Sequence, residues 1–264
     1  MVTDTAKSDS IRKLTDEQLG DFDREYMNPR MFNALCEWIQ HQKSLKNSFD
    51  FLDVGGGNGV FADKMLAAYP EATGTVLDNS ELLLQRNKPH ARKALELRSA
   101  EFVDGLDHSF DLIFFNFVLH HFVVGGYLET RRRQIDILRK AASRLKPDGH
   151  IVFLECMPQG MISDTLCSFL INRITSSRLL ASFVRSAGAN TGGIGVCFLG
   201  KYQWQRTVRE AGLETSHYQY FGTWGESIRL FRLKKLCLTM KSISNAFFFV
   251  RIERDACGAH SDAM

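Results

Sequence analysis

The residues with the clearest chemical potential are four glycines, Gly55, Gly56, Gly57 and Gly59, in the stretch FLDVGGGNGVFADKML at 51–66. They follow a short apolar run and precede a segment with helical spacing. A glycine-rich turn between a strand and a helix lets a ligand approach the backbone, and the free N–H groups of the helix favour a polar or negative ligand. The stretch therefore predicts a ligand-binding loop, with a plain tight turn as the alternative.

The glycine spacing argues against two common nucleotide motifs. A dinucleotide fingerprint needs G-x-G-x-x-G, but here Gly55, Gly57 and Gly59 are followed by Val60. A P-loop needs Gly-Lys-Ser/Thr after its glycines, and that sequence does not follow. The loop is thus expected to take another ligand class.

A carboxylate follows the next β-branched run. Asp78 ends the run ATGTVLD, so it should emerge at the same edge of a parallel sheet as the glycine turn. A carboxylate there accepts two hydrogen bonds from a ribose diol. The alternative is a helix N-cap, but Asn79 or Ser80 could fill that position and leave Asp78 for the ligand.

Three candidate bases follow two other apolar runs. His120 and His121 come directly after FFNFVL, and Glu155 ends the run HIVFLE. The carboxyl ends of interior parallel strands face the ligand crevice, and an ordinary histidine titrates near neutral pH. His121 is favoured because Phe122 resumes the apolar run after it. The alternative is that both histidines serve only packing or hydrogen bonding.

The elements that must position these residues alternate between strand and helix. Predicted strands fall at 49–54, 72–78, 94–102, 111–117 and 150–156, and helices at 60–69, 80–86 and 127–145. The connections are too long for hairpins. The pattern predicts an α/β, doubly wound and mostly parallel sheet with helices on both faces.

The flanking segments add helices and two more strands. Helical spacing occupies 11–42, with a break at Pro29, then 161–186 and 201–211, while 213–222 and 246–254 read as strands. The predicted division is an N-terminal helical cap (1–48), a core (49–157), a helical substrate cover (158–212), closing strands (213–254) with an insert at 222–246, and a tail (255–264).

Four stretches resemble, in order, the class I S-adenosylmethionine-dependent methyltransferases that act on small molecules. They are FLDVGGGNG, TVLDNS, SAEFVDGLDHSFDLIFFNFVLHHF and LKPDGHIVFLE. The resemblance implies a Rossmann-like, seven-stranded sheet whose last strand is antiparallel, and S-adenosylmethionine as cofactor. The last two predicted strands fit the end of that sheet.

The resemblance also implies roles for individual residues. It assigns the methionine end of the cofactor to Asp53, Gly55, Gly57 and Gly59, and the ribose to Asp78. Asn79, next to Asp78, is expected to bind the cofactor as well. The adenine is assigned to Glu101, with Phe102 beside it, and the region of the sulfonium to Asn116. Asp104 is the fallback for adenine if the loop register differs.

Composition and charge limit the kinds of partner that we expect for this protein. The net charge of +3 is too small to argue for a nucleic acid, and we expect none. The six cysteines have no metal-ligand spacing, so no metal is expected, and the N-terminal residues have no export signal, which favours the cytoplasm. The basic amphipathic stretch IRLFRLKK could contact a membrane surface, and a homodimer stays open.

The predicted function is methyl transfer from S-adenosylmethionine to an apolar or aromatic small molecule, in metabolite or natural product biosynthesis. The accepting atom, oxygen, nitrogen or carbon, stays open. Aromatic residues of the flanking segments, such as Phe32, Phe169 and Phe183, are expected near the substrate. The alternatives are a rearrangement or cyclisation in which no methyl is lost, and a silent cofactor-binding partner protein.

Overall fold

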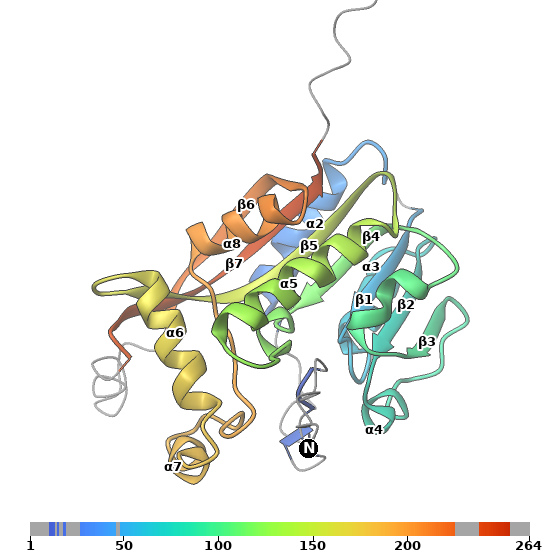
Figure 1. Cartoon of the computed structure of the whole chain (residues 1–264). Helices are drawn as coiled ribbons and strands as arrows, with labels where there is room; N and C mark the ends of the chain where they lie inside the picture. Colours follow the sequence, from blue (N-terminus) through green and yellow to red (C-terminus); the bar gives the residue numbers. More distant parts are fainter. Residues whose placement is uncertain are drawn as a thin grey trace, which may run out of the picture.

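The computed structural model describes residues 11–13, 15, 18–19, 27–45, 48–224 and 238–253, and its centre is a seven-stranded sheet (Figure 1). The strand order is β3-β2-β1-β4-β5-β7-β6. β7 is antiparallel to both β5 and β6, and the pairs from β3 to β5 are parallel. The strands are β1 Asp50–Val54, β2 Thr73–Asp78, β3 Lys93–Leu97, β4 Phe110–Asn116, β5 Leu145–Gly160, β6 Leu213–Trp224 and β7 Met240–Ile252. The predicted fold class is confirmed.

Helices cover both faces of this sheet. They are α2 Pro29–Gln40, α3 Val60–Ala68, α4 Glu81–Leu84, α5 Tyr127–Ala142, α6 Asp164–Thr175, α7 Ala181–Ser186 and α8 Lys201–Glu210, with 3₁₀ turns η1 Ala100–Gly105 and η2 Leu119–His121. Apolar residues of α5 and α8 pack on one face, and those of α2 and α3 pack on the other. Figure 1 shows α5 and α8 in front of the sheet and α2 behind it.

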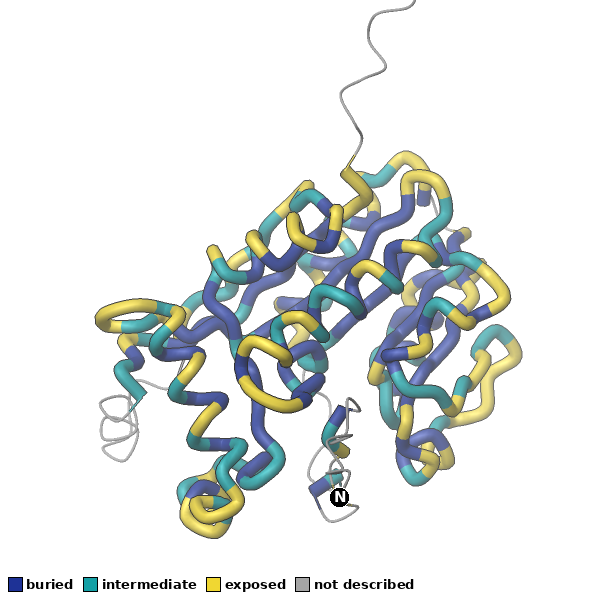
Figure 2. Tube along the Cα trace, viewed as in Figure 1, coloured by how far each residue is buried: buried dark blue, intermediate teal, exposed yellow. Residues whose placement is uncertain are grey.

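Phenylalanines fill much of the two cores. Figure 2 shows the central strands as the buried part of the molecule. β4 and β7 each alternate between the two cores, because successive side chains of a strand point to opposite faces. Eight rings are fully buried there: Phe51, Phe110, Phe114, Phe115, Phe153, Phe247, Phe248 and Phe249. The abundance of phenylalanine therefore serves mainly the core.

Several predicted boundaries differ from the structure, among them those of β5, which spans Leu145–Gly160 where a strand at 150–156 is predicted. The strand expected at 94–102 ends at Leu97, and its last residues lie in η1. β6 continues to Trp224 and β7 begins at Met240, so the connection between them is shorter than the predicted insert at 222–246. β7 is longer than expected because it pairs with β5 as far as Gly160. The stretch IRLFRLKK lies outside the described residues.

α6 packs on the extended ends of β5 and β7 rather than on the main sheet. Cys167 and Ile171 of α6 form a small core with Met240 and Ile243 of β7 and with Val196. This end of the molecule therefore stands apart from the two main cores. No helix in the described part of the chain is long and apolar enough to cross a membrane.

Candidate active site

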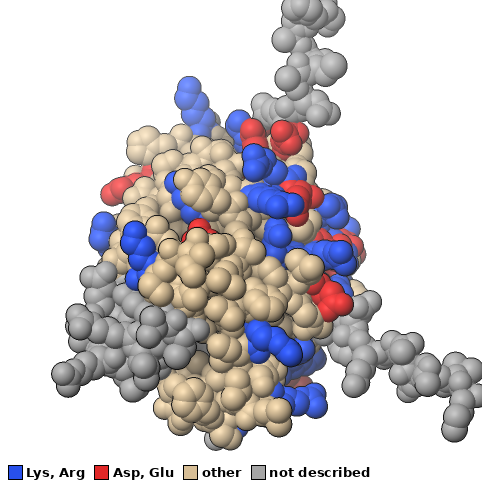
Figure 3. All heavy atoms as spheres, turned by 60° about the vertical axis from the view of Figure 1, so that its left-hand side comes forward, with Lys and Arg blue, Asp and Glu red and all other residues tan. Residues whose placement is uncertain are grey.

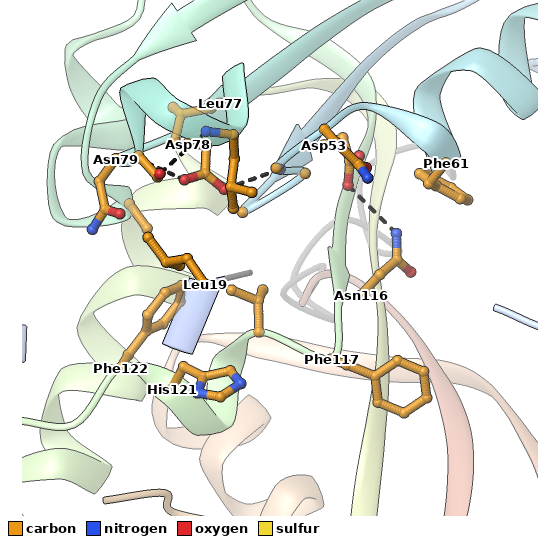
Figure 4. Close-up of a pocket in the computed structure, with 18 of the residues that line it drawn as sticks. Leu19, Asp53, Phe61, Leu77, Asp78, Asn79, Asn116, Phe117, His121 and Phe122 are labelled. Atoms are coloured by element: carbon orange, nitrogen blue, oxygen red, sulfur yellow. Dashed lines mark hydrogen bonds between the residues drawn. The ribbon is translucent and has the colours of Figure 1, made fainter. Parts of the chain in front are cut away.

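A cavity of about 870 Å³ lies at the carboxyl ends of β1, β2 and β4. Figure 4 shows Asp53, Asp78 and Asn79 on one side of it and Phe117 and His121 on the other. Eight predicted site residues line it: Asp53, Gly55, Gly57, Asp78, Asn79, Asn116, His120 and His121. Gly59, Glu101, Phe102 and Glu155 do not. The sheet topology explains the agreement, because parallel strands bring their carboxyl ends to one edge.

The glycine loop is shaped by the protein's own packing as well as by space for a ligand. A Cβ on Gly55 would lie 2.4 Å from Val118 Cγ2, and one on Gly59 would lie 1.8 Å from Asn87 Oδ1. Both glycines also have positive φ, where side chains are disfavoured. A Cβ on Gly57 would meet nothing closer than 3.4 Å. Of these three, only Gly57 leaves room beside the backbone.

The Asp78 carboxylate accepts hydrogen bonds from the glycine loop and from the residue that caps α4. Its Oδ2 accepts a hydrogen bond from the Gly57 amide at 3.0 Å, and its Oδ1 accepts one from the Ser80 amide at 2.8 Å. Ser80 is the N-cap of α4, with its hydroxyl accepting from Leu83 N at 3.3 Å. Burial raises the pKa of Asp78, and the backbone hydrogen bonds oppose that rise. The carboxylate still has lone pairs for a ligand because each oxygen accepts more than one hydrogen bond.

A second carboxyl group, at the end of β1, is almost completely buried. Asp53 is 1% exposed, and its Oδ1 accepts a hydrogen bond from Asn116 Nδ2 at 3.5 Å (Figure 4). Its Oδ2, like Asn116 Oδ1, has no hydrogen-bond partner among the described residues. Burial raises the pKa of Asp53 to about 7, and the charge of Asp78 adds to the rise. A buried, unpaired carboxyl oxygen on a cavity wall suits a cationic or hydrogen-bonding ligand group.

We expect Asp53→Asn to stabilise the ligand-free protein at alkaline pH by about 1–3 kcal/mol. The folded-state pKa lies above the ordinary 3.8, so the folded state binds more protons than the unfolded state up to about pH 7. The free energy of unfolding of the wild type therefore falls as the pH rises through this window. Asparagine does not titrate, so the variant should lose this part of the slope. Urea unfolding at several pH values measures it, and equal slopes for both proteins would contradict the expectation.

The residues predicted to contact the adenine do not line the cavity. The Glu101 carboxylate lies 3.5 Å from Arg133 Nη1 on α5, and Phe102 is 61% exposed. The fallback, Asp104, does not line the cavity either. Ser99 and Ala100 line it instead. The cause is the turn η1, which begins at Ala100, shortly after β3 ends at Leu97, and directs Glu101 toward α5.

The two histidines lie in η2, in different surroundings. His120 is buried, and its Nδ1 lies 2.7 Å from Oε2 of Glu155, which is fully buried. The ring of His121 borders the cavity and lies 4.2 Å from that of His120, centroid to centroid. Burial lowers the pKa of both histidines and raises the pKa of Glu155 to about 8. Glu155 thus lies behind His120 rather than at the cavity, and His121 is the best placed of the three.

The structure adds lining residues that sequence reasoning missed. Cys156 and Asn245 come from β5 and β7, and Phe117 follows β4 with a φ of 54°. Asn245 comes directly before the apolar run AFFFV, so its place beside a predicted strand was visible in the sequence. Nothing in the sequence marks Phe117 as a residue with left-handed backbone. A non-glycine residue in this region is uncommon and tends to occur at functional sites.

The roof of the cavity comes from two segments far apart in sequence. Arg12 donates to the Ile194 carbonyl at 3.0 Å and to the Gly125 carbonyl at 3.1 Å. Gln18 and Asn190 each donate a side-chain N–H to the other's carbonyl, at 2.6 and 2.9 Å. Six lining residues lie in these segments or beside them: Ile11, Arg12, Lys13, Leu19, Met27 and Ile194.

The predicted substrate cover therefore takes part less than expected. Ile194 is the cavity-lining residue that the range 158–212 supplies. Phe169 and Phe183 are exposed, and Phe32 packs with the core beneath α2. The reason is that α6 packs on the ends of β5 and β7 and away from the cavity.

Comparison with known proteins decides the family. A family model described as "Methyltransferase domain" matches residues 52–151, the segment that holds the glycine loop, Asp78 and Asn116. This part of the chain is a class I, S-adenosylmethionine-dependent methyltransferase domain. No curated protein matches the chain at a significant level.

Solved structures share the fold of the methyltransferase domain. The mitomycin 7-O-methyltransferase MmcR is 15% identical, with a TM-score of 0.52 over 78% of this chain and 49% of that one. LepI in complex with S-adenosylmethionine is 14% identical, with a TM-score of 0.56 over 90% and 53%. A Leishmania major S-adenosylmethionine-dependent methyltransferase is 12% identical, with a TM-score of 0.55 over 83% and 70%. The chain spans about half the length of the first two.

The cofactor of the methyltransferase domain is S-adenosylmethionine. The residues present fit it. The unpaired Asp53 Oδ2 suits a cationic amino group, the space beside Gly57 admits a ligand against the backbone, and Asp78 retains acceptor capacity. The cavity is also at the large end of the roughly 300–1,000 Å³ typical of ligand pockets. It is therefore large enough to be shared by a cofactor and a second small molecule.

Proposed function

We propose that the protein transfers a methyl group from S-adenosylmethionine to a proton-bearing oxygen or nitrogen of an apolar small molecule. The observation that carries this proposal is the single cavity that joins the glycine loop and Asp78 to His121. The wall that would bind the cofactor and a basic side chain thus border one cavity. The methyltransferase family match supports the reaction class.

In this proposal, each wall of the cavity binds a different part of the cofactor. Asp53 and the Gly57 backbone hold the methionine end of the cofactor, Asp78 with Asn79 the ribose, and Ser99 with Ala100 the adenine end. Asn116, at the end of β4, borders the place where the two ligands meet. When bound, the cofactor supplies a methyl group activated by its sulfonium.

His121 is proposed as the general base. Its lowered pKa keeps the imidazole neutral at neutral pH, so it accepts the proton that the nucleophile loses. His120 and Glu155 act behind it as positioning residues, because the Glu155–His120 contact fixes the turn η2 from which His121 projects. The rest of the rate enhancement comes from alignment and exclusion of water, which are worth about 7–11 kcal/mol in favourable cases.

The substrate side of the cavity favours an apolar acceptor. Its walls away from the glycine loop carry many apolar side chains, with basic ones in the roof and at the edge. The apolar and neutral lining residues there include Met27, Phe61, Phe117, Phe122, Cys156, Ile194 and Asn245, and the basic ones include Arg12, Lys13 and Lys64. Small-molecule pockets have this composition, with a few polar groups that fix orientation. An aromatic or aliphatic metabolite with one hydroxyl or amino group fits this description.

Calorimetry followed by a product screen tests the function. The wild type should bind S-adenosylmethionine and its demethylated product S-adenosylhomocysteine, and it should not bind NADH. Incubation with S-adenosylmethionine and a library of apolar alcohols, phenols and amines should then yield S-adenosylhomocysteine in equal amount to a methylated product. Binding of NADH in place of S-adenosylmethionine would overturn the proposal.

A second function deserves the same screen. The solved structures with this chain's core fold include one described as "A Pericyclic Reaction enzyme" and one of LepI in complex with S-adenosylmethionine. The alternative is therefore a rearrangement for which S-adenosylmethionine is bound but keeps its methyl group. The two functions differ in one readout, because a rearrangement yields an isomer of the substrate and no S-adenosylhomocysteine.

We expect Gln18→Ala to loosen the roof. The variant loses the hydrogen bond from the Gln18 side chain to the Asn190 carbonyl and keeps the one from the Asn190 side chain to the Gln18 backbone carbonyl. Subtilisin should then cut the glycine-rich segment around Gly192 and Gly193 about three- to tenfold faster than in the wild type, and cofactor should slow the cut in the wild type. Gln159→Ala on β5 is the control, because its side chain pairs with Ser242 away from the cavity. Equal cleavage of wild type and Gln18→Ala would contradict the expectation.

A further inference from the structure

The tip formed by α7 and the turn before it exposes an unusual set of apolar side chains. Leu179 is 97% exposed, Phe183 is 70% exposed and Leu180 is 41% exposed. Val184 is the buried residue of the six-residue helix α7. We call Arg178, Leu179, Leu180 and Phe183 the α7 patch. Large exposed apolar side chains that gather at one place usually mark an interaction site.

The charge around the α7 patch has one sign. Residues 165–200 contain three arginines, Arg173, Arg178 and Arg185, and no aspartate, glutamate or lysine. All three arginines are exposed. Figure 3 brings the α6–α7 end forward and shows a face that is mostly uncharged, with Lys and Arg side chains more frequent than acidic ones. This balance differs from that of the whole chain, which has 33 basic and 30 acidic residues.

This combination favours a lipid surface over a second copy of the chain. A two-fold dimer through the α7 patch would place the same arginines of both copies close together, where like charges repel. An anionic bilayer presents the opposite charge, and its interface accepts leucine and phenylalanine side chains between headgroups. Each basic residue near such a surface contributes to the attraction.

The α7 patch also lies next to the roof of the cavity. Ala189 donates its amide to the Val184 carbonyl at 3.1 Å, and Gly193 donates to the Thr175 carbonyl at 2.7 Å, so α6 and α7 hold the segment that leads to Ile194. Arg178 is near enough to Arg12 in the roof to lower the pKa of that guanidinium, after burial as the larger cause. Attachment through the α7 patch would therefore bring the roof to the lipid surface.

We propose that the α7 patch docks the protein on anionic membranes. The consequence for the substrate rests on the proposed function: an apolar acceptor dissolved in the membrane would be taken up beside the roof. The docking itself needs no cofactor and no acceptor, so it is tested separately from methyl transfer.

The test is co-sedimentation of the full chain with vesicles. The wild type should pellet with phosphatidylcholine vesicles that contain phosphatidylserine and remain in solution with phosphatidylcholine alone. Leu179→Ser with Phe183→Ser should weaken binding by at least about tenfold, because two large apolar side chains no longer enter the interface. Arg173→Gln with Arg178→Gln should weaken it by about tenfold and reduce its salt dependence.

Matched control variants carry the same chemical changes elsewhere. Leu95→Ser on β3 removes an exposed leucine, and Arg132→Gln on α5 removes an exposed arginine, and both should bind vesicles like the wild type. Circular dichroism verifies that every variant is folded. The proposal is overturned if the wild type does not pellet, if the α7-patch variants bind as well as the controls, or if light scattering shows that these variants dissociate a dimer. Vesicle binding without methyl transfer would leave docking intact and count against the proposed function.

Discussion

Replacing His121 by alanine should lower turnover by about 10²–10⁴-fold and leave the affinity for S-adenosylmethionine within about twofold of the wild type. The reason is that His121 borders the cavity on the side opposite Asp53 and Asp78, where a nucleophile would lose its proton. Removal of a general base affects the transition state and not the binding of the cofactor. Single-turnover kinetics with an acceptor from the screen, together with calorimetry, measures both quantities.

The neighbouring residues supply the controls for this prediction. Glu155→Gln keeps the size of the side chain but replaces one oxygen of the pair with His120 by an amide nitrogen. Because Glu155 is a positioning residue, Glu155→Gln should lower turnover less than His121→Ala does. It should also change the pH profile of turnover. Glu155 ionises only above its raised pKa of about 8, where its charge raises the pKa of His121, whereas glutamine stays neutral at every pH. The two profiles should therefore differ in their alkaline part. If His121→Ala keeps turnover within about tenfold of the wild type, His121 is not the base.

The sheet could be predicted because its strands are marked locally. β1 and β4 are apolar on both faces, as interior parallel strands must be, and turn-forming or polar residues separate the runs. The end of the edge strand β3 is harder to predict from the sequence. Its residues are mostly exposed or half-buried, so the apolar pattern does not show where it ends, and the sequence predicts a strand that continues into η1.

The cofactor side was predictable for the same reason. Asp53, Gly57 and Asp78 each sit at the end of an interior strand, and chain connectivity alone brings such ends to one edge of the sheet. Glu101 lies farther along, beyond β3. Its direction depends on contacts with α5, in particular with Arg133, which is remote in sequence. Local pattern could not reveal that contact.

The roof could not be predicted because its parts meet only in the folded chain. Arg12 reaches Ile194 across 182 positions, and Gln18 reaches Asn190 across 172. None of these residues belongs to a motif, and hydrogen bonds to backbone carbonyls leave no mark on the sequence of the partner. The aromatic residues of the flanking segments suggested a substrate site. Where each ring packs in the folded chain decides whether it reaches the cavity, and the sequence does not show that.

Replacing Asp78 by alanine should weaken S-adenosylmethionine binding by about 2–4 kcal/mol, or roughly 30- to 1,000-fold. Two effects add. The variant loses a carboxylate able to accept hydrogen bonds from the ribose, and it releases the Gly57 amide, which donates to Asp78 Oδ2 at 3.0 Å. Calorimetry on the folded variant measures the loss.

The two effects of Asp78 are separable because another residue holds the same loop without lining the cavity. Asn87 donates its side-chain N–H to the Gly57 carbonyl at 2.8 Å and lies outside the cavity wall. Asn87 also donates to the Leu83 and Leu84 carbonyls at the end of α4, but only its bond to Gly57 holds the loop. Asn87→Ala should therefore weaken binding by only about three- to tenfold, the cost of one neutral hydrogen bond to the loop. If Asn87→Ala weakens binding as much as Asp78→Ala, Asp78 acts through the loop alone and does not hold the ribose. A much larger loss for Asp78→Ala, with equal thermal stability of the two variants, would place the carboxylate in contact with the cofactor.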